Sequence, residues 1–264
     1  YLEEWSMKHS LLKKKKFIFF ILKKLISISF IFFSNEGEFK DSKKNLKIFS
    51  AFVIPNGMDT SLYNYKEEIF NHKKKIIFFG RIHKKKGIEI LLDAIRELPK
   101  EYFLKYSFEI TGPGETNYIN KIIKIMKSYH IDEYVKMLPP KIGIEKIKYL
   151  QNSDVFVLPS FEEGDSIALK EAMSARNAVI ISEQCRVNTV KDENAGIVIK
   201  TNKDSLKNAL LQLDKFDLKA MGVNSKNIIE KYYDNDFCSK RVLKIYEDIH
   251  TGSYSSDDWV KNYE

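Results

Sequence analysis

The chain has 264 residues, of which 44% are hydrophobic and 30% are charged, and its formal net charge is +8. This length supports one sizeable core, with room for one domain and part of another. Two cysteines, Cys185 and Cys238, stand far apart with no C-x-x-C pair, which excludes a disulfide framework and indicates free thiols in a reducing compartment. The five histidines lack the spacing of metal ligands, so no metal site is expected. The lysines are spread through the chain without a recognisable nucleic-acid-binding module, so nucleic acid is not an expected partner.

The N-terminal stretch predicts part of a domain rather than a membrane span. Residues 8–33 alternate basic and apolar runs, and neither apolar run reaches the roughly 20 residues that a span needs. Lys23 and Lys24 would lie mid-bilayer at a cost of about 2.5–3.5 kcal/mol each. A signal peptide would need a small-residue cleavage site, which is absent. We expect a basic helix followed by a buried strand at 27–33; a helix lying on a membrane surface is the alternative.

The next segments place a domain border between residues 53 and 75. Residues 34–47 are polar and predict a loop with a short helix. Residues 53–59 read V-I-P-N-G-M-D, a strand that ends in a Pro-Asn-Gly turn. Residues 60–74 then have the composition of a linker.

From Lys75 onward, short apolar runs alternate with amphipathic stretches. Strands are predicted at 76–79, 108–111, 135–138, 155–158, 179–181 and 197–199. Helices are predicted at 87–98, 117–129, 144–152, 168–175, 204–213, 218–231 and 237–249. This alternation predicts an α/β fold, a Rossmann-like parallel sheet with helices on both faces. In such sheets ligands bind at the carboxyl ends of strands, where Gly80, Arg81, Gly112, Pro140 and Glu163 lie.

Two loops at these strand ends carry the candidate chemistry. Residues 159–173 read P-S-F-E-E-G-D-S-I-A-L-K-E-A-M, a loop followed by a helix, with Glu163 in the loop and Glu171 in the helix. The free N–H groups of the helix's first turn attract phosphate, and the two carboxylates can accept hydrogen bonds from sugar hydroxyls. The loop G-R-I-H-K-K-K-G at 80–87 brings Arg81 and Lys86 beside another helix N-terminus, where they can grip a diphosphate. The alternatives are a surface helix rich in glutamate and a solvated basic loop.

Taken together, these motifs resemble the nucleotide-sugar-binding half of the group 1 (family 4) glycosyltransferases of GT-B fold. The resemblance is carried, in this order, by V-I-P-N-G-M-D, G-R-x4-K-G, T-G-P-G and N-S-D-V-F-V-L-P-S-x2-E-G-x6-E-A-M, and it covers about residues 50–250. It implies a remnant of the acceptor domain at 1–52, a nucleotide-sugar-binding domain at 53–250 and a polar tail at 251–264. Most of the family's first domain is expected upstream of Tyr1.

The resemblance also implies residue roles. Arg81 and Lys86 match the pair that holds the donor diphosphate, Glu163 lies near the donor sugar, and Glu171 binds ribose hydroxyls without supporting the core. Of these, the catalytic group is Glu163, Arg81 and Lys86. The complete donor-binding set is Gly80, Arg81, Lys86, Gly112, Pro140, Glu163, Gly164, Asp165, Ser166, Ile167, Ala168 and Glu171. The family commonly has Phe-Gly where this chain has Asp165-Ser166, which adds a negative charge near the expected phosphate.

The function implied is sugar transfer from a nucleotide-diphosphate sugar to a glycan or lipid-linked acceptor, with retention, in surface polysaccharide or lipopolysaccharide biosynthesis. No cofactor or metal is expected beyond the donor substrate, and the expected location is cytoplasmic, at the inner face of the membrane. Two alternatives remain: a non-catalytic nucleotide-sugar-binding fragment, and a sugar-nucleotide epimerase or phosphorylase of the same fold.

Overall fold

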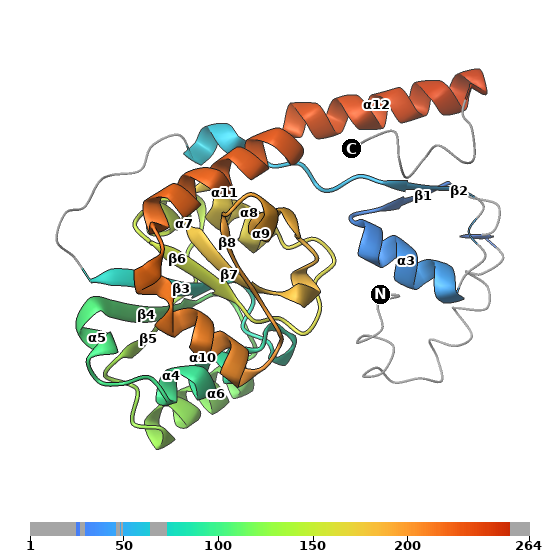
Figure 1. Ribbon diagram of the computed structural model, residues 1–264. Helices are drawn as coiled ribbons and strands as arrows, with labels where there is room; N and C mark the ends of the chain where they lie inside the picture. Colours follow the sequence, from blue (N-terminus) through green and yellow to red (C-terminus); the bar gives the residue numbers. More distant parts are fainter. Residues whose placement is uncertain (1–24, 27–29, 46–47, 49, 64–72, 254–264) are drawn as a thin grey trace. The chain divides into compact units, whose positions relative to one another are not determined.

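The computed structural model describes residues 25–26, 30–45, 48, 50–63 and 73–253 (Figure 1). The chain divides into two compact units, one formed by residues 1–57 with 232–264 and the other by residues 58–231. The boundary between residues 57 and 58 lies inside the range 53–75 expected from the sequence. The boundary between residues 231 and 232 places residues 232–250 in the first unit, whereas the sequence assigned them to the nucleotide-sugar-binding domain. The reason lies in the core of the first unit, described below.

The second unit is built on a parallel sheet. Its strands are β3 (Lys74–Phe79), β4 (Tyr106–Thr111), β5 (Val135–Leu138), β6 (Val155–Leu158), β7 (Ala178–Ser182) and β8 (Gly196–Ile199). They lie in the order β5-β4-β3-β6-β7-β8, and every neighbouring pair is parallel. All six predicted strands are confirmed, with small shifts at their ends. The central strand β6 is buried throughout, as expected for a parallel sheet that is covered on both faces.

The strand order reverses between β3 and β6. From β3 the chain proceeds outward through β4 and β5, then crosses back so that β6 pairs with β3 on its other side. Ile76 of β3 stands opposite Val155 of β6 in this pairing. In open parallel sheets the crevice at such a switch point, beyond the strands' carboxyl ends, is where ligands bind.

Helices cover both faces of this sheet (Figure 1). Helix α4 packs against α6 and α10, whereas α7 packs against α8. Their apolar stripes explain the packing, since α4 buries Ile88, Leu91, Leu92, Ala94 and Ile95 at helical spacing. The helices are α4 (Ile88–Arg96), α5 (Tyr102–Lys105), α6 (Thr116–Ser128), α7 (Gly143–Gln151), α8 (Ile167–Ser174), α9 (Thr189–Asp192), α10 (Lys203–Leu211) and α11 (Leu218–Tyr232).

Several short elements were not predicted. They are the four-residue helices α5 and α9 and the 3₁₀ turns η1 (Thr60–Tyr63), η2 (Lys84–Lys86), η3 (Glu183–Cys185) and η4 (Leu213–Lys215). Segments of three or four residues are too short to show a helical period. Turn η1 also corrects the linker prediction for 60–63, because its Tyr63 is buried.

The first unit contains β1 (Phe30–Phe33), α3 (Glu36–Asn45), β2 (Ser50–Val53) and α12 (Asn235–Thr251). The two strands are parallel, and α3 joins them. Phe52 of β2 and Ile245 of α12 form a small core, on which Phe30, Ile54 and Ile249 pack. Helix α12 therefore belongs to this unit, because its apolar side is buried there.

The predicted basic helix and the start of the strand predicted at 27–33 lie outside the described residues. Among the helices in the described part of the chain, none has the length and apolar composition of a membrane span.

Candidate functional site

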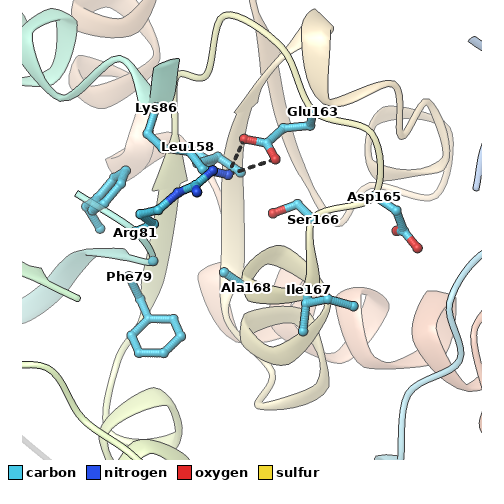
Figure 2. A pocket seen from close by; sticks show the side chains of 11 residues that line it. Phe79, Arg81, Lys86, Leu158, Glu163, Asp165, Ser166, Ile167 and Ala168 are labelled. Atoms are coloured by element: carbon cyan, nitrogen blue, oxygen red, sulfur yellow. Dashed lines mark hydrogen bonds and ion pairs between the residues drawn. The ribbon is translucent and has the colours of Figure 1, made fainter. Parts of the chain in front are cut away.

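A cavity of about 210 Å³ opens at the switch point, where β3 and β6 end (Figure 2). Its walls come from three segments: the end of β3 with the loop after it, the end of β6, and the loop that leads into α8. The lining residues are Phe78, Phe79, Gly80, Arg81, Lys86, Leu158, Glu163, Asp165, Ser166, Ile167 and Ala168. The sheet topology thus brings together two motifs that lie about 80 positions apart in the sequence.

Glycines allow the strand ends to close on each other beside this cavity. Gly80 has a φ of 144° and Gly112 a φ of 148°, in the region that side chains avoid. A Cβ on Gly112 would lie 1.8 Å from the carbonyl oxygen of Gly80, and a Cβ on Gly87 would lie 2.0 Å from that of Pro159. A side chain at Gly112 or Gly87 would overlap backbone atoms, so these close approaches require glycine.

The two functional loops are joined by hydrogen bonds. The backbone N–H of Phe161 donates to the carbonyl oxygen of Lys85 at 2.9 Å, and the Ser160 hydroxyl donates to the same oxygen at 3.0 Å. The Ser182 hydroxyl in turn donates to the Ser160 carbonyl at 2.6 Å. These bonds fix the loop that carries Lys86 relative to the loop that carries Glu163.

Lys86 and Glu163 form a nearly buried ion pair in the cavity wall. The ammonium nitrogen lies 2.7 and 2.8 Å from the two carboxylate oxygens, and the side chains are 16% and 7% exposed. Burial of either charge alone would be costly, so each requires the other. An ammonium carries three N–H donors, so Lys86 keeps one for a ligand while it holds Glu163.

Arg81 is the cation that remains available. Its side chain is exposed at the cavity, and within the described residues it has no ion pair with a carboxylate. In Figure 2 its guanidinium lies beside Lys86 and faces the start of α8. Because Glu163 balances Lys86, the cavity owes its net positive character to Arg81 and to the helix N-terminus.

The N-terminus of α8 faces the same cavity. Ser166 is its N-cap, and its hydroxyl accepts a hydrogen bond from the Leu169 N–H at 3.4 Å. Residues 167 and 168 line the cavity, and their first-turn N–H groups have no carbonyl partner within the helix. This is an anion-binding geometry.

His83 caps the basic turn η2. Its Nδ1 accepts a hydrogen bond from the Lys85 N–H at 3.1 Å, which requires a neutral ring nitrogen. Burial lowers the pKa of His83, and the positive charges of Arg81 and Lys84 lower it further. The histidine is thus a structural acceptor in this loop.

Asp165 does not add an unbalanced charge, contrary to the concern raised by the sequence. Its carboxylate lies 2.6 Å from the ammonium of Lys170 on α8, with side chains only 9% and 5% exposed. Figure 2 shows the carboxylate turned away from Lys86 and Glu163. Lys170 had not been singled out in the sequence, because a lysine in the middle of a helix usually faces solvent.

Glu171 has protein partners as well. The Lys146 ammonium of α7 lies 2.5 Å from its carboxylate, and the buried hydroxyl of Tyr63 is hydrogen-bonded to it. Burial, and then the charge of Glu171, raise the pKa of Tyr63 above its usual value. The expectation that Glu171 plays no part in holding the fold is therefore wrong: it joins η1, α7 and α8.

The predicted donor-binding residues are only partly brought together. Eight of the predicted positions line the cavity: Gly80, Arg81, Lys86, Glu163, Asp165, Ser166, Ile167 and Ala168. Gly112 packs directly against the backbone of Gly80, and Gly164 lies in the sequence between the lining residues Glu163 and Asp165. Pro140 and Glu171 do not line it: Pro140 follows the edge strand β5, and Glu171 lies one turn further along α8. Their roles stay predictions.

Sequence reasoning missed the apolar wall formed by Phe78, Phe79 and Leu158. Nothing distinguishes these residues from ordinary strand residues until the strand order is known. It also missed Lys146 and Tyr63, which meet Glu171 only in the folded unit. Within the described part of the chain, no group of three or more His, Cys, Asp or Glu side chains could hold a metal ion.

Residues 61–226 match the family model of the glycosyl transferases group 1. The chain belongs to this family. The match spans the whole sheet, the cavity and both functional loops, so the resemblance read from the motifs is confirmed.

Two relatives illustrate this membership. The chain is 32% identical, over 73% of its own length and 52% of the relative's, to the UDP-Gal:alpha-D-GlcNAc-diphosphoundecaprenol alpha-1,3-galactosyltransferase of Escherichia coli. It is 28% identical, over 69% of its length and 47% of the relative's, to an uncharacterised glycosyltransferase of Methanocaldococcus jannaschii. The chain thus spans about half the length of the curated relatives it matches.

Solved structures confirm the fold class. Sucrose-phosphate synthase from Thermosynechococcus elongatus matches with a TM-score of 0.80 at 17% identity, over 96% of this chain and 67% of that one. Anabaena HepE, solved in complex with UDP and glucose, matches with a TM-score of 0.74 at 16% identity, over 90% and 70%. Both belong to glycosyltransferases of the GT-B fold, and at these identities the likeness concerns the fold alone.

Proposed function

We propose that this chain supplies the donor-binding half of a retaining glycosyltransferase. The enzyme would transfer a sugar from a nucleotide-diphosphate sugar to a glycan or lipid-linked acceptor, in surface polysaccharide or lipopolysaccharide biosynthesis at the cytoplasmic face of the membrane. The observation that carries the proposal is the cavity at the switch point, where Arg81, Lys86 and the N-terminus of α8 converge. Membership in the group 1 family supports it.

In this proposal the cations and the helix N-terminus stabilise the leaving group. When the bond between the sugar and the diphosphate breaks, negative charge develops on the leaving phosphate oxygens. Arg81 can bind these oxygens through its forked guanidinium, and Lys86 through the N–H that Glu163 leaves free. The N–H groups of residues 167 and 168, which line the same cavity, would donate to these oxygens as well. Donors fixed in advance toward developing charge are usually the largest contribution an enzyme makes.

In this proposal the carboxylates of Glu163 and Glu171 bind the uncharged parts of the donor, namely the transferred sugar and the ribose. Glu163, at the inner wall of the cavity, would accept hydrogen bonds from hydroxyls of the transferred sugar while it holds Lys86. Glu171, one turn along α8, would accept them from the ribose. Tyr63 and Lys146 then orient its carboxylate before the nucleotide arrives.

The activities for which the relatives are named favour a uridine nucleotide and a lipid-linked acceptor. The Escherichia coli relative uses UDP-galactose and a diphosphoundecaprenol acceptor, and a Campylobacter jejuni relative also acts on a diphospho-undecaprenol substrate. Anabaena HepE was solved with UDP. We therefore expect UDP to bind better than GDP or ADP.

Calorimetric titration of the chain with these three nucleotides and with their nucleosides tests the proposal. Arg81→Ala should weaken binding of the preferred diphosphate about tenfold, which corresponds to about 1.4 kcal/mol, because a charge-assisted contact is lost. Binding of the nucleoside and thermal stability should stay unchanged, since the Arg81 side chain is exposed. Lys84→Ala is the matched control: it removes a positive charge from the same loop, but its side chain does not line the cavity. Absence of binding by any nucleoside diphosphate would refute the proposal.

A further inference from the structure

The Asp165–Lys170 pair has no counterpart in the expected motif, where Phe-Gly stands in place of Asp165-Ser166. Asp165 lines the cavity, and Lys170, on the first turns of α8, is 4% exposed. Lysine is rarely buried to this degree unless it is paired. Here its ammonium lies 2.6 Å from the Asp165 carboxylate.

The direction in which the Asp165 side chain points matters because this residue lies next to the N-terminus of α8. It immediately precedes Ser166, the N-cap of α8. The free N–H groups and positive dipole at this end of a helix attract any nearby carboxylate. If Asp165 turned toward them, it would occupy the position proposed for the donor phosphate and would repel the diphosphate. Instead its side chain is turned away from Lys86 and Glu163 (Figure 2).

We propose that Lys170 is the internal counter-ion of Asp165, a positioning residue that keeps this carboxylate off the anion site and neutralises it. The inference rests on the proposed function. It assigns Lys170 a role in donor affinity although its side chain does not line the cavity. It also explains how this chain accommodates an acidic residue beside a diphosphate site.

Two single substitutions test the inference, because they should change ligand affinity in opposite directions. In Lys170→Met the carboxylate loses this counter-ion and its negative charge stays beside the helix N-terminus, so affinity for UDP and for inorganic pyrophosphate should fall roughly fivefold. In Asp165→Asn the anion is removed while Lys170 keeps its positive charge, so affinity for both ligands should rise. The double variant Asp165→Asn/Lys170→Met should return to within about twofold of the parent. Uridine should bind all variants equally.

A merely structural pair would behave differently. Both single variants would then weaken binding in parallel with their loss of thermal stability, and that outcome would overturn the inference. The double variant guards against misfolding of the single ones, because replacing a buried ion pair by neutral side chains is often neutral for stability. Lys226→Met is the matched control, since Lys226 is similarly buried at 6% but lies on α11, which contributes nothing to the cavity wall.

The two ligands separate this inference from the proposed function. If the parent binds pyrophosphate with the expected opposite shifts but does not bind UDP, the donor proposal fails and the role of Lys170 stands. If the parent binds UDP and both single variants weaken it, the donor proposal stands and the role of Lys170 fails. If the parent binds neither ligand, both are wrong.

Discussion

At the scale of single residues, the carboxylates of the site are already engaged before a nucleotide arrives. Glu163 holds Lys86, Asp165 holds Lys170, and Glu171 is held by Lys146 and Tyr63. The neighbouring Glu162 is also buried, and its carboxylate lies 3.1 Å from the Lys85 ammonium. Each acidic residue of this loop and helix therefore has a cationic partner within the protein.

Glu171→Gln is expected to lower both stability and nucleotide affinity. Loss of the charge weakens the contacts with Lys146 and Tyr63, which should cost about 1–2 kcal/mol of unfolding free energy. The proposed ribose contact would weaken by a similar amount, so affinity for UDP should fall about tenfold. Thermal unfolding and calorimetry on the same samples measure the two effects.

Lys146→Met separates these two roles of Glu171. It removes the ion pair but leaves the Glu171 carboxylate and its Tyr63 partner in place for ribose, so stability should fall while UDP affinity falls less than in Glu171→Gln. Glu145→Gln is the surface control, because its carboxylate is 64% exposed and surface pairs contribute little. Unchanged UDP affinity in Glu171→Gln would contradict the ribose assignment.

At the scale of elements, the site depends on how closely the ends of β3 and β4 approach. The Gly80 N–H donates to the Thr111 carbonyl at 3.1 Å, and the Ile82 N–H donates to the Pro113 carbonyl at 2.7 Å. These bonds continue the ladder of the two strands past their ends. Gly112 lies between them, where its missing side chain leaves room for the Gly80 carbonyl.

Gly112→Ala should therefore damage both fold and site. Its Cβ would overlap the Gly80 backbone and would also require a strained φ, so we expect a loss of at least about 3 kcal/mol in unfolding free energy. Gly143→Ala is the control: Gly143 also has a positive φ, of 54°, but its Cβ would meet nothing within 4 Å. That change should cost roughly 1–2 kcal/mol. Equal stability losses in urea titrations would show that the close approach is unimportant.

At the scale of the whole molecule, the two units have separate cores. The first unit's core is centred on Phe52 and Ile245, whereas every residue of the cavity belongs to 58–231. The family match at 61–226 falls entirely within the second unit.

Residues 58–231 alone should consequently fold and bind UDP with the affinity of the full chain. A domain with its own core and its own complete site does not need its neighbour for either property. A single cooperative unfolding transition and an unchanged dissociation constant are the expected results. Loss of binding in this well-folded fragment would show that residues outside 58–231 contribute to the nucleotide site.

The sequence by itself determined the α/β class, the positions of the strands and longer helices, and the two functional loops. Those features are local: apolar runs form buried strands, amphipathic periods form helices, and Gly80 or the Pro-Asn-Gly turn ends an element. The ordered motifs also identified the family. Elements of four residues, such as α5 and α9, escaped because they contain too few residues for a period.

Only the tertiary structure decided which charges meet. Lys86 and Glu163 are 77 positions apart, and Lys146 and Glu171 are 25 apart, so their pairing depends on the strand order that places β3 beside β6 and α7 beside α8. The assignment of α12 to the first unit likewise required knowledge of where Ile245 is buried. Ion pairs and burial depend on distances through space. The spacing of residues along the chain predicts such distances only within a single helix or strand.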